Sequence, residues 1–250
     1  MTEPRPAGSP ASGPVRPPAS PAQAARGEVR KGGGAPLREE LRVGVLASGR
    51  GSNLQAIIDA IERRELDARL AVVISDREGA PALERAREHG APAVFANPKD
   101  HVDRVAYDLA LLRLLEAHRV GLVCLAGFMR ILSPPFIRSL AGRVMNIHPS
   151  LLPAFPGLAA QRQALDYGVK VTGATVHFVE EGVDTGPIIV QDAVPVLPDD
   201  TEDTLSARIL EVEHRLYPRA IRLFAEGRLT IAGRCVIVAE ADHVPPSAPR

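Results

Sequence analysis

Between residues 41 and 126, short apolar runs alternate with segments of helical periodicity, and this alternation limits the fold more than any other feature. Strands are predicted at 42–47, 70–75, 91–95 and 121–126, where short apolar runs are bounded by polar or glycine residues. Helices are predicted at 54–61, 79–89 and 100–118, the last with a buried stripe of Val102, Val105, Leu109, Leu112 and Leu115. Strands that alternate with helices form parallel sheets with right-handed crossovers. The predicted fold class is therefore α/β, with a doubly wound, mostly parallel sheet and flanking helices.

The chain is predicted to contain one domain, residues 41–232, between two tails. Further strands are expected at 171–179, 188–195 and 227–231, and a long helix is expected to begin near 199. Residues 1–40 contain eight prolines and no apolar periodicity, so we expect them to be disordered. Residues 233–250 are expected to form a C-terminal tail.

Charge and composition argue against several classes of partner. Lys and Arg together number 30, as do Asp and Glu, so the balanced charge gives no case for nucleic acid or an anionic membrane. No apolar run approaches the roughly 20 residues of a membrane span, and the N-terminus has no apolar signal core. We therefore expect a cytoplasmic protein. The two cysteines, Cys124 and Cys235, lack the spacing of a metal or redox site, and Cys124 reads as a buried thiol.

A glycine-rich turn at 48–53 joins the first strand to the first helix. Glycines allow a close approach of the backbone to a ligand, and the free N–H groups and dipole of a helix N-terminus favour an anion. Gly49, Gly51, Ser52 and Asn53 are thus candidates to hold a phosphate. The spacing departs from the dinucleotide fingerprint, and a purely structural turn is the alternative.

Asn146 and His148 alternate with apolar residues in a β-prone run, so their side chains are expected on one face of a strand. An amide beside an imidazole can stabilise a developing oxyanion, although two satisfied polar groups at a strand end is the alternative. Asp184, in a glycine-bearing loop at 180–187, is either a turn residue or a carboxylate that faces His148. His177 reads locally as a hydrogen-bonded strand histidine.

Two further stretches remain ambiguous on local grounds. The apolar residues of 127–134 either cap the core or line a pocket for a flat apolar ligand. Glu213 lies beside the apolar stripe of the last helix, and an exposed carboxylate is the default interpretation.

Together, residues 49–53, 125–132, 146–153 and 183–187 resemble the folate-dependent formyltransferases, and among them the phosphoribosylglycinamide formyltransferases of purine synthesis. The resemblance extends over residues 41–231. It implies formyl transfer from the co-substrate 10-formyltetrahydrofolate to the amine of glycinamide ribonucleotide, without a metal. It also implies small-molecule partners only, and a monomer or homodimer.

The resemblance assigns roles to residues that match the family motifs. The catalytic residues would be Asn146, His148 and Asp184. Substrate would be held by Gly51, Ser52, Asn53 and Glu213. Contacts to the folate would come from Arg104, Met129, Arg130, Ile131, Leu132, Asn146, Glu180, Glu181, Gly182, Val183 and Asp184.

One loop departs from the family pattern, because Leu158, Ala159, Ala160 and Gln161 stand where polar residues are usual. Sibling activities on the same frame are methionyl-tRNA formyltransferase and formyltetrahydrofolate hydrolase. We expect neither, because the residues after Ile231 are too few for the extra C-terminal domain of the tRNA enzyme. Residues 1–40 are likewise too short for the N-terminal regulatory domain of the hydrolase. A non-catalytic folate-binding module would predict a broken catalytic set, whereas all three positions are intact.

Overall fold

A nine-stranded sheet runs through residues 40–240, which are the residues that the computed structural model describes. The strand order is β3-β2-β1-β4-β5-β6-β7-β9-β8. Nearly all of the predicted tail 1–40, and the last ten residues of the tail 233–250, lie outside the described residues.

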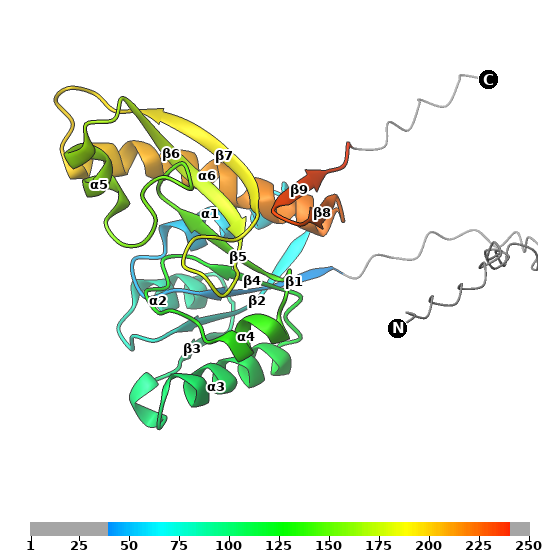
Figure 1. The fold of residues 1–250 in the computed structure, drawn as a ribbon. Helices are drawn as coiled ribbons and strands as arrows, with labels where there is room; N and C mark the ends of the chain where they lie inside the picture. Colours follow the sequence, from blue (N-terminus) through cyan, green and yellow to red (C-terminus); the bar gives the residue numbers. More distant parts are fainter. Residues whose placement is uncertain (1–39, 241–250) are drawn as a thin grey trace, which may run out of the picture. The chain divides into compact units, whose positions relative to one another are not determined.

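The first half of the sheet is parallel, as predicted (Figure 1). Its strands are β1 (Leu41–Leu46), β2 (Ala68–Ser75), β3 (Ala93–Phe95), β4 (Leu122–Leu125) and β5 (Val144–His148). The connecting helices are α1 (Ser52–Glu62), α2 (Pro81–Glu88), η1 (Pro98–Asp100), α3 (Arg104–Ala117) and α4 (Pro134–Ser139). This βα alternation confirms the doubly wound α/β prediction.

The second half of the sheet is mixed. Its elements are α5 (Ala160–Tyr167), β6 (Val171–Phe178), β7 (Ile188–Pro195), α6 (Glu202–Ala225), β8 (Leu229–Ala232) and β9 (Cys235–Val238). β6 runs antiparallel to both β5 and β7, whereas β9 pairs in parallel with β7. The predicted domain boundary at 232 left out β9, which pairs with β8 at the end of the sheet.

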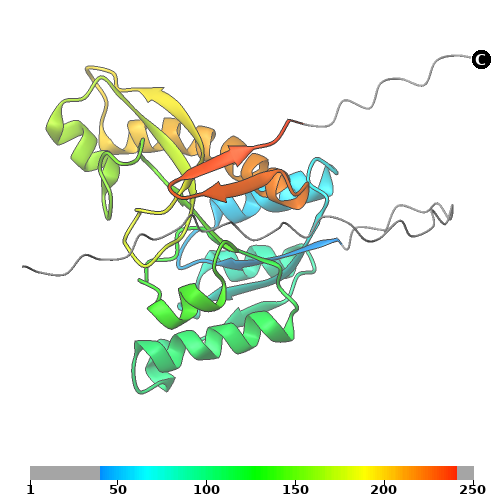
Figure 2. The ribbon, with the colours of Figure 1, turned by 45° about the vertical axis from the view of Figure 1, so that its right-hand side comes forward.

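Two apolar layers cover the sheet, one on each face. One layer packs α1, α2 and α6 on the sheet, and the other packs α3 and α4 on the opposite face (Figure 2). Strands with both faces covered must be apolar throughout, and β4 is buried at every position. Among the described residues, none of the helices combines the length and the apolar character that a membrane span requires.

The predicted buried stripe of the third helix is partly wrong. Val102 is 94% exposed, and Val105 and Leu109 are 39% and 42% exposed. The helix begins only at Arg104, where the Asp103 side chain accepts a hydrogen bond from the backbone of Ala106, so Val102 precedes it. The buried face is instead set by Tyr107, Asp108, Leu111, Leu112 and Leu115, which repeat at three- and four-residue spacing.

Candidate active site

The glycine-rich turn places the start of α1 at the carboxyl end of β1. Gly51 has a φ of +74° and directly precedes the helix, a left-handed conformation that glycine adopts without strain. A Cβ at Gly51 would lie 2.9 Å from the Ala82 Cα, so the turn also packs against α2 too closely for a side chain. Ser52 and Asn53 are the first residues of α1, and no acidic residue lies in its first turn. The turn is therefore suited to an anion.

Glu213 reaches this turn from α6 and is buried, contrary to the default expectation of an exposed carboxylate. Asn53 Nδ2 donates to Glu213 Oε2 at 2.7 Å, which joins residues 160 positions apart. Burial raises the pKa of Glu213 to about 7, although the Asn53 hydrogen bond acts in the lowering direction. The Asn53 Oδ1 atom is also buried and has no hydrogen-bond partner within residues 40–240. An unsatisfied buried acceptor is costly, which favours a polar ligand at this point.

Asn146 and His148 lie on alternate positions of β5, as the extended pattern predicts. In the antiparallel register, Asn146 pairs with His177 of β6, and His148 pairs with Thr175. His148 is buried, and Asn146 is half-buried. The hydroxyl of Tyr217 of α6 donates to the backbone carbonyls of Leu125 and Met145, each at 3.0 Å. This buried link fixes α6 to the two strands that carry the site.

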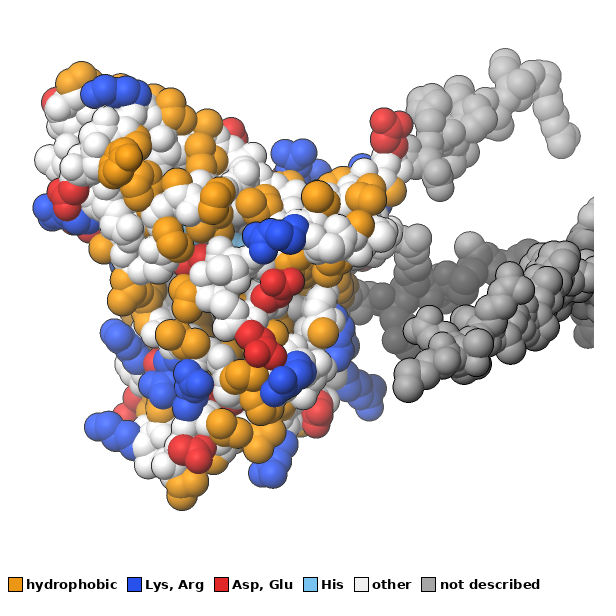
Figure 3. All heavy atoms as spheres, viewed as in Figure 1, with side chains coloured by type: hydrophobic (Ala, Val, Ile, Leu, Met, Phe, Trp, Pro, Cys, Tyr) orange, Lys and Arg blue, Asp and Glu red, His pale blue; other side chains and the backbone are white. Residues whose placement is uncertain are grey.

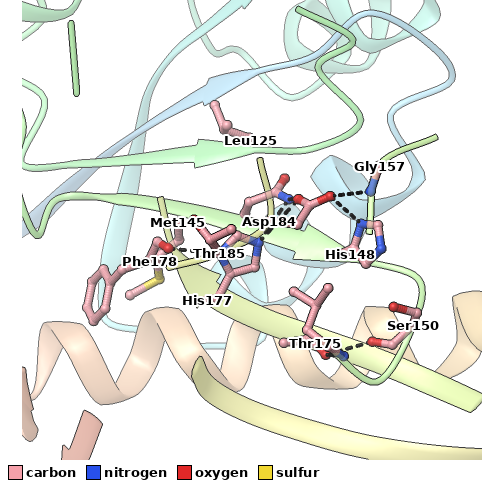
Figure 4. A network of polar contacts seen from close by, with 12 residues as sticks. Leu125, Met145, His148, Ser150, Gly157, Thr175, His177, Phe178, Asp184 and Thr185 are labelled. Atoms are coloured by element: carbon pink, nitrogen blue, oxygen red, sulfur yellow. Dashed lines mark hydrogen bonds and ion pairs between the residues drawn. The ribbon is translucent and has the colours of Figure 1, made fainter. Parts of the chain in front are cut away.

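The Asp184 carboxylate is the centre of the cluster (Figure 4). Its Oδ1 atom lies 3.4 Å from Asn146 Nδ2 and 3.6 Å from His177 Nε2. Its Oδ2 atom lies 3.4 Å from His148 Nδ1 and accepts a 2.8 Å hydrogen bond from the Gly157 backbone N–H. The sequence left two roles open for this residue; Asp184 lies in a turn, and its carboxylate also faces His148.

The surroundings keep Asp184 ionised. Burial by itself would raise the pKa of Asp184, but hydrogen bonds from His177 and Gly157 and the charge of His148 outweigh burial and lower it. His148 has an acceptor at each ring nitrogen, because Nε2 also lies 2.8 Å from the Phe155 carbonyl oxygen. Nδ1 of His148 thus faces the Asp184 carboxylate, and Nε2 faces the Phe155 carbonyl.

The loop that carries Asp184 folds back across the sheet. β6 runs antiparallel to β5, so its carboxyl end lies beside the start of β5, and the loop must return to reach His148. A Cβ at Gly186 would collide with the Phe178 carbonyl, which shows how closely the loop packs on the strand. Asp184 itself has a φ of 53°. Non-glycine residues in this region are uncommon and cluster at functional sites.

His177 was not assigned a site role from sequence. Its Nδ1 atom lies 2.8 Å from the Phe178 carbonyl oxygen, and its Nε2 atom lies 3.3 Å from Asn146 Nδ2. It is hydrogen-bonded as the local reading expected, but it also contacts Asp184 and Asn146. The missing information is the pairing register of β5 and β6, which a single sequence does not supply.

Only some of the candidate folate contacts have side chains exposed on the surface. Met129 and Ile131 are 60% and 59% exposed, whereas Leu132 is 7% exposed and joins the core on the α3 face. The apolar stretch after β4 therefore caps the core through Leu132 and leaves Met129 and Ile131 exposed. The Arg130 guanidinium carbon lies 5.2 Å from the centre of the Tyr107 ring, an attractive cation–π contact.

Other predicted folate contacts come from the loop after β6. Val183 is 48% exposed, and Glu181 pairs with Arg138 at 3.3 Å. Within residues 40–240, no hydrogen bond or ion pair joins Arg104 to another predicted folate contact. On the face shown in Figure 3, apolar side chains lie between charged ones over the region that Figure 1 places around α4.

The donor set near the centre is made of histidine, amide and carboxylate groups. Within residues 40–240, no group of three or more His, Cys, Asp or Glu side chains is arranged to hold a metal ion. The loop at 158–161, which departs from the family pattern, carries an exposed Leu158. Ala159 precedes α5 with a φ of 55°.

Comparison with known proteins finds a matching family model, similar proteins and similar solved structures. Residues 41–221 match the model of the formyl transferase family. The chain is 53% identical over 193 residues to the trifunctional purine biosynthetic protein adenosine-3 of Drosophila melanogaster, a match that covers 76% of this chain and 14% of that protein. This chain thus spans about a seventh of the length of that relative.

Two similar proteins are closer to this chain in length. The phosphoribosylglycinamide formyltransferase of Escherichia coli K12 is 46% identical over 189 residues, covering 76% of this chain and 89% of that protein. The crystal structure of glycinamide ribonucleotide transformylase 1 from Symbiobacterium toebii aligns with a TM-score of 0.81 and 55% identity. That alignment covers 84% of this chain and all of the other.

Proposed function

This chain belongs to the formyl transferase family, and from that premise we propose that it transfers the formyl group of 10-formyltetrahydrofolate to the amine of N1-(5-phospho-D-ribosyl)glycinamide. The names of the Escherichia coli and Symbiobacterium toebii relatives support this substrate, and the name of the Drosophila melanogaster relative supports a place in purine synthesis. The observation that carries the proposal is the Asp184 carboxylate, which contacts Asn146 and His148 at one point of the sheet.

The phosphate and ribose of the substrate would bind at the start of α1. Gly51, Ser52 and Asn53 present a helix N-terminus that favours a phosphate. Glu213 and the unpartnered Asn53 Oδ1 offer buried acceptors for ribose hydroxyls. In this arrangement the phosphate anchors the substrate, and the amine extends toward Asp184.

The reaction forms one carbon–nitrogen bond and breaks another. The neutral amine attacks the formyl carbon, whose oxygen takes the negative charge of a tetrahedral intermediate. The Asn146 amide and the His148 imidazolium donate hydrogen bonds to that oxygen. Each well-placed donor contributes on the order of 3 kcal/mol, or 10²–10³ in rate. Collapse of the intermediate then expels the N10 nitrogen of tetrahydrofolate.

His148 must exchange one partner before it can serve the formyl oxygen. Its Nδ1 faces Asp184, and its Nε2 faces the Phe155 carbonyl. Asp184 holds the charge and orientation of the ring, so the Phe155 carbonyl is the partner that the formyl oxygen replaces. The loop after β5 therefore has to move away from the ring in the productive complex.

Asp184 carries the proton that moves from the attacking nitrogen to the leaving nitrogen. The attacking nitrogen must lose a proton after the bond forms, and the leaving folate nitrogen must gain one. The lowered pKa of Asp184 keeps its carboxylate ionised, so that it accepts the proton through a bridging water and passes it on. General acid–base transfer of this kind contributes roughly 10²–10⁴ in rate.

The folate would lie between the loops that follow β4 and β6. The exposed side chains of Met129, Ile131 and Val183 offer apolar surface to its flat rings. Buried Leu132 would contribute through its backbone. The remaining proposed contacts are Arg104, Arg130, Asn146, Glu180, Glu181, Gly182 and Asp184.

Formyl transfer by the purified chain tests the proposal directly. With both substrates present, the absorbance change of the deformylated folate should accompany formylation of the amine one for one. Release of formate without the ribonucleotide would instead indicate a hydrolase on the same frame. Absence of both reactions would refute the catalytic proposal.

A further inference from the structure

A cationic groove lies between α1 and α6, on the surface that leads away from the phosphate turn. It encloses about 740 Å³, and Ser52 at the start of α1 belongs to its lining. Figure 2 shows the two helices on the same side of the sheet, where they pack on one another. Ligand pockets typically enclose about 300–1,000 Å³, so the groove is large enough for a small organic molecule.

The charge of the groove stands out from a chain whose net charge is zero. Five arginines line it, Arg63, Arg85, Arg215, Arg219 and Arg222, and among the described residues two carboxylates do so, Asp59 and Glu65. Arg215 and Arg222 also pair with Asp192 and Glu226, which lie outside the lining, so five positive charges face four negative ones and the excess is one. Arginine's planar fork of donors matches phosphate oxygens, so this surface favours a phosphorylated anion.

Arg85 gives the groove a fixed cation at its entrance. The half-buried side chain donates from Nε to the Arg50 carbonyl and from Nη1 to Gln55 Oε1, each at 3.0 Å. These bonds attach the guanidinium to the phosphate turn and leave further donors free. Within residues 40–240, neither Arg85 nor Arg219 forms an ion pair with a carboxylate. Their charge is therefore available to a ligand.

Small and apolar residues also line the groove. Ala56, Ala60 and Pro218 line it, so the space between the helices is not filled by bulky side chains. His214 also lines it, and its buried Nε2 atom has no hydrogen-bond partner among the described residues. The groove thus combines cationic walls with an unsatisfied polar atom and room for more than an inorganic ion.

We propose that this groove binds the polyphosphate group of a small phosphorylated molecule, end to end with the substrate phosphate. The groove begins at Ser52 and reaches Arg63 at the far end of α1, a span of roughly 16 Å at 1.5 Å per residue. A triphosphate fits along that length. Because its nearest phosphate would lie beside the substrate phosphate, the two anions repel, and each weakens binding of the other.

The test measures binding of inorganic tripolyphosphate to the full chain by calorimetry at low ionic strength. Arg219→Gln together with Arg222→Gln should weaken the affinity at least about tenfold, because two charge-assisted contacts are lost. The matched control is Arg113→Gln with Arg143→Gln, two exposed arginines that do not line the groove, and it should bind as the wild type does. A nucleoside triphosphate that binds more tightly than tripolyphosphate would show that the groove also contacts the nucleoside. Equal affinities of the two compounds would show that the groove recognises only the phosphates.

Several outcomes would overturn the site. They are no binding by the wild type, equal losses in both double variants, or an unaffected groove variant, which would place the anion on the phosphate turn itself. The effect on turnover rests on the proposed function: tripolyphosphate should raise the KM for the ribonucleotide in the wild type but much less in the groove variant. Binding without any formyl transfer would refute the proposed function alone, and transfer without binding would refute the groove alone.

Discussion

Replacing Glu213 with Gln should make the protein more stable above neutral pH. Glu213 is buried, and burial raises its pKa to about 7 against 4.5 for the free side chain. Between these values the folded state holds a proton that the unfolded state has released, so the free energy of unfolding falls as the pH rises. The contribution is fully favourable below about pH 4.5 and is lost as the pH passes 7. Gln keeps the acceptor for Asn53 and carries no charge.

The size of the effect follows from the pKa difference. A difference of 2.5 between 7 and 4.5, at 1.36 kcal/mol per unit, corresponds to about 3 kcal/mol across the whole range. Between pH 5 and pH 8, the variant should gain about 2–3 kcal/mol relative to the wild type. For a domain of this size that gain raises Tm by roughly 5–10 °C.

Thermal unfolding of both proteins between pH 5 and pH 8 measures this difference. His214, whose pKa burial lowers, is present in both proteins and cancels in the comparison. Glu211→Gln is the matched control, because it removes an exposed carboxylate from the same helix and should leave the pH profile unchanged. A Glu213→Gln protein whose Tm follows that of the wild type at every pH would refute the reasoning.

Two other substitutions test the frame around the site. Gly51→Ala should lower the free energy of unfolding by more than about 1 kcal/mol and raise the KM for the ribonucleotide, because the added Cβ would meet Ala82 and the residue has a φ of +74°. Denaturant unfolding measures the first effect and steady-state kinetics the second. An unchanged stability and an unchanged KM would contradict the close packing. Tyr217→Phe should cost about 1–3 kcal/mol, because the Leu125 and Met145 carbonyls lose a buried donor; an unchanged urea midpoint would contradict that role.

Local periodicity predicted the parallel half of the fold well. The strands β1 and β4 are short and apolar because both of their faces are covered, and this pattern is visible in the sequence. The alternation that placed Asn146 and His148 on one face of a strand is equally local. The roles of these residues came from the resemblance to a family, because spacing alone left a structural alternative open.

Features that depend on distant parts of the chain could not be predicted. Glu213 is buried where α6 packs on α1, and its hydrogen-bond partner Asn53 lies 160 residues earlier. The buried face of α3 depends on what the helix packs against, and the predicted stripe included Val105, which is 39% exposed, and missed Tyr107, which is buried two residues later. The position of Asp184 depends on a loop that folds back along antiparallel strands, and the contact of His177 depends on their register.

The central claim is that Asp184 acts on the reaction through His148 and the moving proton, and does not hold the ribonucleotide. Asp184→Asn keeps the size of the side chain and removes its charge, so it isolates this role. Exposed Asp166, changed to Asn in the same way, is the matched control. The decisive measurement pairs calorimetric binding of glycinamide ribonucleotide with the kcat of formyl transfer.

The account predicts wild-type affinity for the ribonucleotide in Asp184→Asn, with kcat lower by roughly 10²–10⁴, the range of a lost acid–base group. Asp166→Asn should match the wild type in both quantities. Retained turnover in Asp184→Asn, or a loss of ribonucleotide binding that accounts for the whole defect, would contradict the account.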